Sequence, residues 1–177
     1  NGDEIPTGYS NNDWINLSTS AYAVYDDNES NADIYGYLYN WYAGDDERGI
    51  CPGGWYVPSN DDWIELEDYL GGLSVAGGKL KDTGTIEDGN GLWFSPNEGA
   101  TNESGFTALP GGMRYPIDCS PPGSYCELNA RGRFWTSTFE NDGPPDGGRS
   151  RLLLYNSPGS EPGWNYLTGG FSVRCIR

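Results

Sequence analysis

The strongest constraint on the fold comes from two segments that lie far apart in the sequence. Residues 54–63 read Gly-Trp-Tyr-Val-Pro-Ser-Asn-Asp-Asp-Trp and predict an extended stretch that runs into a capped helix. Residues 170–177 form a short apolar strand that carries Cys175 close to the C-terminus. Because Cys51 precedes the first segment, a Cys51–Cys175 bond would tie the end of the chain to its middle. This architecture is typical of cross-linked extracellular modules that bind ligands without transforming them.

Four cysteines allow three disulfide pairings. Cys119 and Cys126 flank a turn-rich loop that a local bridge would close, which leaves Cys51 to pair with Cys175. The alternatives are four free thiols or a metal site, but no C-x-x-C spacing supports zinc. We therefore expect two disulfides and an oxidising, extracellular or cell-surface compartment.

The charge of the chain excludes two classes of partner. Its 177 residues include 26 acidic and 10 basic side chains, a formal net charge of −16 at pH 7. Nucleic acid and anionic lipid both require clustered Lys and Arg, so neither is expected as a partner. No apolar run approaches the roughly 18 residues of a membrane helix, so no membrane span is expected. The acidic excess indicates a solvated coat or, alternatively, calcium sites built from carboxylate and amide oxygens.

Catalysis is not expected. The sequence contains no histidine, so Ser-His-Asp and Cys-His sites are impossible and the commonest general base is missing. Carboxylate pairs such as Glu65 and Glu67 fall on a predicted helix surface, where carboxylates are normally solvated. Glu103 and Glu140 lie in predicted loops that could converge, and the sequence does not give their separation. Glycosidase chemistry, which needs two suitably spaced carboxyl groups, is therefore not our leading expectation.

Two helices are predicted in the first half of the chain. The first spans residues 34–42, where apolar and aromatic side chains recur at helical spacing, with Asn31 or Asp33 as its cap and Gly44 at its end. The second spans about residues 60–70. The aromatic stripe of the first helix is more typical of core packing than of a ligand platform.

The second helix has the clearest local signals. Ser59 is a good N-cap, Asp62 three residues later completes a capping box, and the pair at residues 71–72 is Gly-Gly, which stops a helix. Beyond residue 72 the helical period disappears. Short strands and Gly-rich loops are expected there, at residues 77–81 (a strand or turn), 106–112, 134–138, 151–155 and 170–176, with a loop at 139–149. Early helices and late antiparallel strands predict a single α+β domain over residues 1–177.

Six segments carry a combined pattern that is highly specific, although each alone is weak. They are YGYLYNWYA at 35–43, CPGGWYVPS at 51–59, AGGKLK at 76–81, TNESGFTALPGG at 101–112, FWTST at 134–138 and GFSVRC at 170–175. In their order and spacing, over residues 12–177, the chain resembles the Fibrobacter succinogenes major paralogous domain (FISUMP) family of secreted and surface-attached bacterial modules.

The resemblance implies a particular fold. The family is similar to C-type-lectin-like folds and, within them, to the branch of the formylglycine-generating enzyme, whose helix-start motif is matched by Val-Pro-Ser-x-x-x-Trp at residues 57–63. The implied architecture is a compact α+β module with two helices, a twisted antiparallel sheet and long structured loops. The end of the chain is then expected to pair near the centre of a sheet.

Three features depart from the family pattern. Relatives usually begin with an additional segment that reads as strands, so this chain is expected to be processed, truncated or completed by a strand from elsewhere. Ala23 stands where relatives often carry Cys, and Phe139 stands where they often carry Glu. Residues 119–126 look like an insertion particular to this sequence.

Candidate ligand-binding residues are aromatic side chains in the later, loop-rich half. Exposed aromatic rings stack on sugars or bury in protein interfaces. For Trp135 the alternative is core packing. The predicted ligand-binding residues are Trp135, Tyr155, Trp164 and Tyr166.

Two polar clusters are candidate calcium ligands that would organise these loops. The alternative for both is plain turn chemistry, since Asn and Asp favour turns without any metal. The clusters are Asn97, Asn102 and Glu103, and Glu140, Asn141 and Asp142.

The sequence therefore predicts a non-catalytic adhesion or binding module on a bacterial surface that recognises carbohydrate or protein through its loops. The first alternative is a structural subunit of an extracellular filament that self-associates through an exposed sheet edge. The second alternative is an oxidase of the formylglycine-generating type, which would hold copper with reactive thiols.

Overall fold

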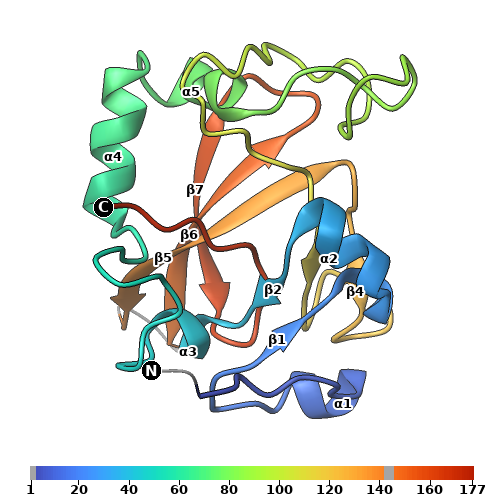
Figure 1. Ribbon diagram of the computed structural model, residues 1–177, viewed down its shortest axis with the longest axis vertical. Helices are drawn as coiled ribbons and strands as arrows, with labels where there is room; N and C mark the ends of the chain where they lie inside the picture. Colours follow the sequence, from blue (N-terminus) through green and yellow to red (C-terminus); the bar gives the residue numbers. More distant parts are fainter. Residues whose placement is uncertain (1–2, 142–145) are drawn as a thin grey trace.

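The chain folds into short helices and small antiparallel sheets, as the α+β prediction requires (Figure 1). A computed structural model describes residues 3–141 and 146–177. Five α-helical segments occur in the described part, whereas two helices were expected. The elements are α1 (Asn11–Trp14), β1 (Tyr22–Ala23), the 3₁₀ helix η1 (Tyr25–Asp27), α2 (Glu29–Tyr35), β2 (Leu38–Tyr39), α3 (Trp41–Gly44), α4 (Asn60–Tyr69), α5 (Leu73–Leu80), β3 (Met113–Arg114), β4 (Tyr125–Cys126), β5 (Arg131–Glu140), β6 (Gly147–Leu154) and β7 (Ser160–Tyr166).

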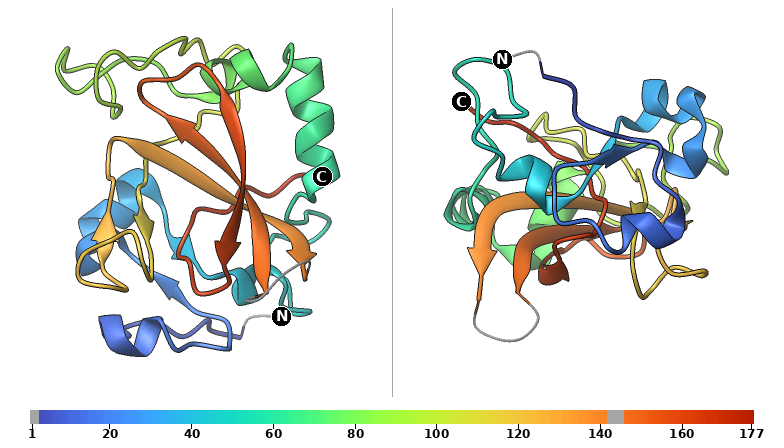
Figure 2. Two further views of the ribbon diagram at one scale, coloured as in Figure 1. Left: turned by 180° about the vertical axis from the view of Figure 1, so that it is seen from behind. Right: turned by 90° about the horizontal axis from the view of Figure 1, so that it is seen from below.

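The central feature is a three-stranded antiparallel sheet in the order β5-β6-β7. Seen from behind, these strands lie nearest the viewer, with α4 beside them and α5 at their upper end (Figure 2). The small β1–β2 pair lies in front of the sheet in Figure 1, and the β3–β4 pair lies to the right of it. The C-terminal segment passes between β2 and β5 and ends beside α4.

The predicted helix at residues 34–42 is wrong in its extent. The helix α2 starts earlier, with Asn28 as its cap, and ends at Tyr35. Gly36 then adopts a φ of 79°, which reverses the helical path and leads into β2. A new short helix, α3, begins after Asn40, whose side chain accepts a hydrogen bond from the Ala43 N–H at 3.2 Å. A break at one glycine and a second cap therefore divide the aromatic stripe among three elements.

The predicted helix at about residues 60–70 is confirmed as α4. The Ser59 side chain accepts from the Asp62 N–H at 3.2 Å, and the Asp62 carboxylate accepts from the Ser59 N–H at 2.7 Å. This reciprocal capping box satisfies two backbone donors that a helix start otherwise leaves unpaired. The positive φ values of Gly71 and Gly72 end the helix as expected.

The segment predicted as a strand or turn at residues 77–81 is instead helical and belongs largely to α5. Its glycines lower helix propensity, which is why the sequence did not indicate a helix. They are present because neighbouring backbone approaches closely. A Cβ atom on Gly77 would lie 1.8 Å from the Gly159 carbonyl oxygen, and one on Gly78 would lie 2.3 Å from that of Gly99. The two glycines therefore let α5 pack directly against two loops.

Replacing Gly77 by alanine is expected to destabilise the fold by about 3 kcal/mol, the upper end of the usual cost of overpacking, because the obstructing atoms are backbone. The measurement is the free energy of unfolding in urea. Gly53→Ala is the matched control, since nothing lies within 4 Å of a Cβ at that position. Equal stability of the two variants would contradict the close packing of α5.

The strand predictions are confirmed in part. Residues 134–138 lie in β5, and most of residues 151–155 lie in β6. Both strands are longer than predicted, because β5 continues to Glu140 and β6 begins at Gly147, within the segment predicted as a loop at 139–149. The strand β7 was not predicted, because Pro162 and Gly163 interrupt its pattern. Residues 106–112 and 170–176 form no regular strand. They are joined to their neighbours by single bridges such as Lys81–Ala108 and Phe134–Ser172, and Thr107 and Gly112 have positive φ.

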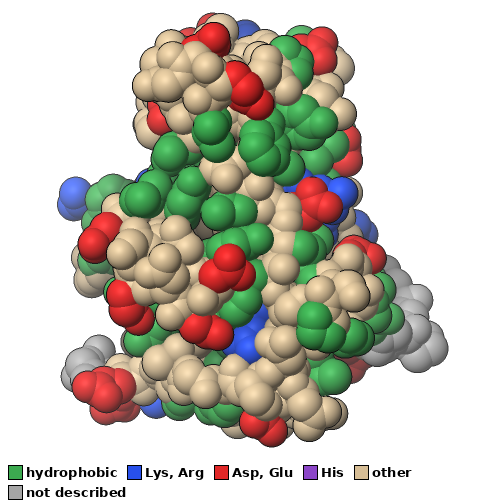
Figure 3. Space-filling model, turned by 90° about the vertical axis from the view of Figure 1, so that its right-hand side faces the viewer, with side chains coloured by type: hydrophobic (Ala, Val, Ile, Leu, Met, Phe, Trp, Pro, Cys, Tyr) green, Lys and Arg blue, Asp and Glu red, His purple; other side chains and the backbone are tan. Residues whose placement is uncertain are grey.

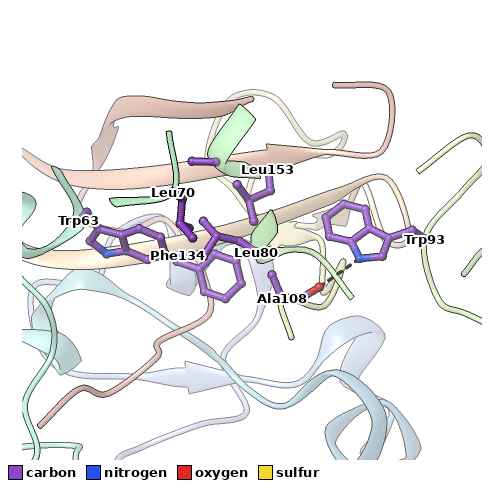
Figure 4. Packing of buried hydrophobic residues seen from close by; sticks show 8 residues of the cluster. Trp63, Leu70, Leu80, Trp93, Ala108, Phe134 and Leu153 are labelled. Atoms are coloured by element: carbon purple, nitrogen blue, oxygen red, sulfur yellow. Dashed lines mark hydrogen bonds between the residues drawn. The ribbon is translucent and has the colours of Figure 1, made fainter. Parts of the chain in front are cut away.

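The main hydrophobic core lies between α4, α5 and the β5–β6 pair (Figure 4). Trp93 lies at one end of this cluster and donates its indole N–H to the Ala108 carbonyl at 3.0 Å. A second cluster is built around Trp41, Trp135 and Phe171 on the opposite side of β5. Across the ranges the structure describes, none of the helices has the length and apolar character needed to cross a membrane.

Candidate functional site

Both predicted disulfides are confirmed. Cys51 is bonded to Cys175 with a Cα–Cα distance of 5.8 Å, and Cys119 to Cys126 with 5.5 Å. All four cysteines are thus bonded. The long-range bond fixes the C-terminal segment, and this segment forms one wall of a groove on the surface.

A groove opens where β2 and the C-terminal segment separate. Tyr39 and Phe171 exchange two backbone hydrogen bonds, of 2.8 and 2.9 Å. Continuing this antiparallel ladder would pair Tyr37 with Val173, but within the described ranges no backbone hydrogen bond joins them. The space that opens has a volume of about 430 Å³. It is lined by residues 32–37, 172–174, Tyr39, Leu109 and Phe134.

Three tyrosines, Tyr35, Tyr37 and Tyr39, are among the residues that line the groove. The ring of Tyr37 lies 5.1 Å from that of Tyr22, at 78°, and 6.3 Å from that of Tyr39. Such edge-to-face contacts hold the rings in fixed positions. Burial raises the pKa of Tyr39, and the neighbouring Tyr37 and Tyr22 raise it further. The hydroxyl of Tyr39 is therefore neutral at physiological pH, when it can both donate and accept hydrogen bonds.

The groove also exposes apolar surface. Ile34 is 46% exposed and Tyr37 is 41% exposed, although both side chains are large and hydrophobic. Two charged residues, Asp33 and Arg174, share the lining. Arg174 donates to the Thr107 carbonyl at 3.2 Å, which directs part of its hydrogen-bonding capacity away from a ligand. The groove thus combines tyrosine residues with a lining whose accessible surface is more polar than apolar.

The sequence did not indicate this groove, because residues 34–42 were interpreted as one helix with a core stripe. A signal was present in the alternation Tyr35-Gly-Tyr37-Leu-Tyr39, whose period of two is typical of an extended segment.

The side of the molecule that carries α2 and β4 shows hydrophobic side chains gathered between groups of acidic ones (Figure 3).

For one of the four predicted ligand-binding aromatics, Trp135, the prediction is wrong. Trp135 is completely buried, its ring centroid lies 4.4 Å from that of Phe171, and its indole N–H donates to the Tyr39 carbonyl at 2.8 Å. The residue belongs to the core and does not face a ligand. Its indole holds the carbonyl of Tyr39 on β2, one of the tyrosines that line the groove.

The other three aromatics do not form one surface. Trp164 is 37% exposed and lies 5.4 Å from Tyr166 between ring centroids, so these two form a pair on β7. Tyr155 follows the far end of β6 and packs against Phe94 at 6.0 Å. The β6–β7 register places Tyr166 beside Gly147, at the opposite end of the ladder from Tyr155.

In the first predicted calcium cluster, each side chain has a protein partner. The Asn97 amide donates to two loop carbonyls at 2.9 Å, and Asn102 exchanges hydrogen bonds with Thr107. Glu103 forms an ion pair of 2.9 Å with Lys79. These are the contacts of ordinary turn chemistry, so calcium stays a prediction here.

In the second cluster, Glu140 pairs with Arg149, Asn141 is exposed, and Asp142 lies outside the described residues. No group of three or more His, Cys, Asp or Glu side chains suited to a metal occurs in residues 3–141 and 146–177. The prediction that Glu67 lies on a helix surface is wrong. That side chain is buried and paired with Arg151, whereas Glu65 is exposed.

A family model of the Fibrobacter succinogenes major domain matches residues 1–177. The chain therefore belongs to the Fibrobacter succinogenes major domain family, a bacterial family, and the resemblance seen in the six sequence segments is confirmed. Comparison with curated proteins and with solved structures gave no match.

Proposed function

We propose that the protein is a non-catalytic binding module of a bacterial surface, with a C-type-lectin-like fold, and that it holds a carbohydrate in the tyrosine-lined groove. The observation that carries the proposal is the opened ladder between Tyr37 and Val173. It leaves aromatic surface and backbone polar groups side by side on a cross-linked scaffold. Disulfides are typical of proteins that work outside the cytosol.

The chemistry of the groove suits a sugar. A sugar ring presents apolar C–H faces and a rim of hydroxyls, and tyrosine offers an apolar ring with a polar tip. Unpaired backbone N–H and C=O groups supply donors and acceptors for the hydroxyls. The volume of about 430 Å³ lies in the usual range for small-ligand sites.

The available side chains support binding without catalysis. Glycoside hydrolysis needs two carboxyl groups, and Asp33 is the sole acidic residue among the groove-lining residues in the described part of the chain. An oxidase of the formylglycine-generating type would need reactive thiols, whereas the four cysteines are paired. These observations support the proposal of a binding module over that of an oxidase.

Replacing Tyr37 by alanine is expected to weaken carbohydrate binding at least about tenfold, a loss of about 1.4 kcal/mol, because the groove loses its exposed ring. The ligand is first identified on a glycan array, and affinity is then measured by isothermal titration calorimetry. Adding a chelator to the same titration tests the predicted calcium.

The matched control is Tyr69→Ala, which removes a tyrosine that is 87% exposed on α4, outside the groove. This variant is expected to bind like the original protein. No binding to any glycan, or equal affinity of the two variants, would count against the proposal.

A further inference from the structure

We infer that the groove takes the end of a glycan chain, so that a terminal sugar unit enters between Tyr37 and Val173 while units within a chain do not. This inference rests on the proposed function. It is carried by the shape of the opened ladder, which is closed at its apex by the Tyr39–Phe171 hydrogen bonds and at its floor by the buried Phe134.

The groove is closed at its apex. The two hydrogen bonds between Tyr39 and Phe171, of 2.8 and 2.9 Å, join the walls at that point. Just beyond, Ser172 is held to β5, because its N–H donates to the Arg133 carbonyl at 2.9 Å and its carbonyl accepts from the Trp135 N–H at 3.0 Å. One wall is therefore fixed to the central sheet and cannot swing away to admit a chain.

Both walls present unused backbone groups. Successive residues of a strand direct their N–H and C=O groups to opposite edges. Val173 therefore faces the same side as Phe171, towards β2, and Tyr37 faces the same side as Tyr39, towards the C-terminal segment. In the described ranges neither Tyr37 nor Val173 forms a backbone hydrogen bond across this gap. A ring placed between them meets donors and acceptors from both sides.

The floor is also closed. Phe134 lines the groove but is only 3% exposed, and it belongs to the main core with Trp63 and Leu153. A ligand therefore cannot pass through the sheet. On the α2 side, residues 32–35 form a further wall.

A sugar unit inside a chain has neighbours at two positions of its ring, so it needs a groove that is open at both ends. A terminal unit has one neighbour and fits a site with a single opening. The net charge of −16 disfavours anionic glycans, and within the lining the charges of Asp33 and Arg174 are opposite in sign, so the groove itself carries no excess positive charge to attract them. The expected ligand is therefore an uncharged terminal sugar.

The test compares one polysaccharide before and after limited cleavage, which adds chain ends without changing the mass of sugar. Neutral β-glucan, mannan and starch dextrin are the probes, and each competes with an immobilised glycan for the intact protein. The inference predicts that competition per gram rises in proportion to the number of chain ends. It also predicts that affinity per molecule is constant from a trisaccharide to a hexasaccharide.

The outcomes separate the two claims. If no preparation competes, the proposed function fails. If a polysaccharide competes equally per gram before and after cleavage, or if affinity grows steadily with chain length, the end-on inference is overturned while carbohydrate binding stands. The end-dependent competition is expected to be lost in Tyr37→Ala and retained in Tyr69→Ala.

Discussion

Replacing Cys51 and Cys175 together by serine is expected to lower the free energy of unfolding by about 5 kcal/mol. The bond joins residues with a sequence separation of 124, and removing it frees a very long loop in the unfolded chain. The Cys119–Cys126 bond has a separation of only 7, so its removal is expected to cost about 2 kcal/mol. Urea unfolding of both double variants, followed by tryptophan fluorescence, measures the difference.

The two double variants serve as controls for each other, because each removes two sulfurs and one cross-link. Equal losses would show that loop length does not determine the effect. Peptide mass mapping of the unreduced protein provides the independent check. A free thiol at position 51 or 175 would contradict the long-range bond itself.

The long-range bond also bears on the groove. Cys175 lies two residues after Val173, so the bond anchors the C-terminal wall near its far end. Without it, the segment from 173 onward is held mainly by the backbone exchange between Tyr56 and Ile176. We therefore expect the variant lacking this bond to bind glycan more weakly than the variant lacking Cys119–Cys126, even under conditions where both are folded.

Features set by neighbouring residues could be predicted from the sequence. The helix α4 was expected because Ser59, Asp62 and the Gly-Gly stop act within a few positions of one another. The disulfides were expected because one pair is local and leaves a single partner for each remaining cysteine. In both cases the physical cause lies in the residues that form the feature.

Features set by distant residues could not be predicted in this way. The helix α5 contains Gly77 and Gly78, whose presence makes sense only once the loops around Gly99 and Gly159 lie against them. The strand β7 tolerates Pro162 because it is an edge strand of the sheet. Tertiary contact outweighs local preference at each of these positions.

The candidate site follows the same rule. The groove depends on a ladder that forms at Tyr39 and Phe171 and then fails at Tyr37 and Val173, and these pairs join opposite ends of the chain. The sequence offered Trp135 as a ligand contact, with core packing as the alternative, because it is aromatic and lies in the loop-rich half. The structure shows that this tryptophan is buried in the core and donates to the carbonyl of Tyr39, one of the groove tyrosines.

The second large effect is expected at a buried ion pair between α4 and β6. The Arg151 guanidinium donates to the Glu67 carboxylate at 2.7 Å, and the two side chains are only 1% and 2% exposed. Arg151 also donates to the Asn60 side chain at 3.0 Å, at the start of the same helix. Removing Arg151 would leave the Glu67 carboxylate buried without its counter-charge, which is costly in a region that water does not reach.

Arg151→Met is therefore expected to lower the free energy of unfolding by about 3–5 kcal/mol, measured by urea denaturation with the disulfides intact. The combined Glu67→Leu and Arg151→Met variant is expected to recover most of that loss, because it removes both buried charges and keeps similar volume. Glu65→Ala, on the exposed side of the same helix, should change stability by no more than about 0.5 kcal/mol.

The contrast among these variants separates two explanations of the pair. If the single variant is costly and the combined variant is not, the ion pair contributes little net stability but fixes how α4 docks on the sheet. If the combined variant loses as much as the single one, the pair is itself stabilising, with its hydrogen bonds to Asn60 and Ser160 as part of the network. A single variant as stable as the original protein would mean that water reaches Glu67, and the buried geometry would then be wrong.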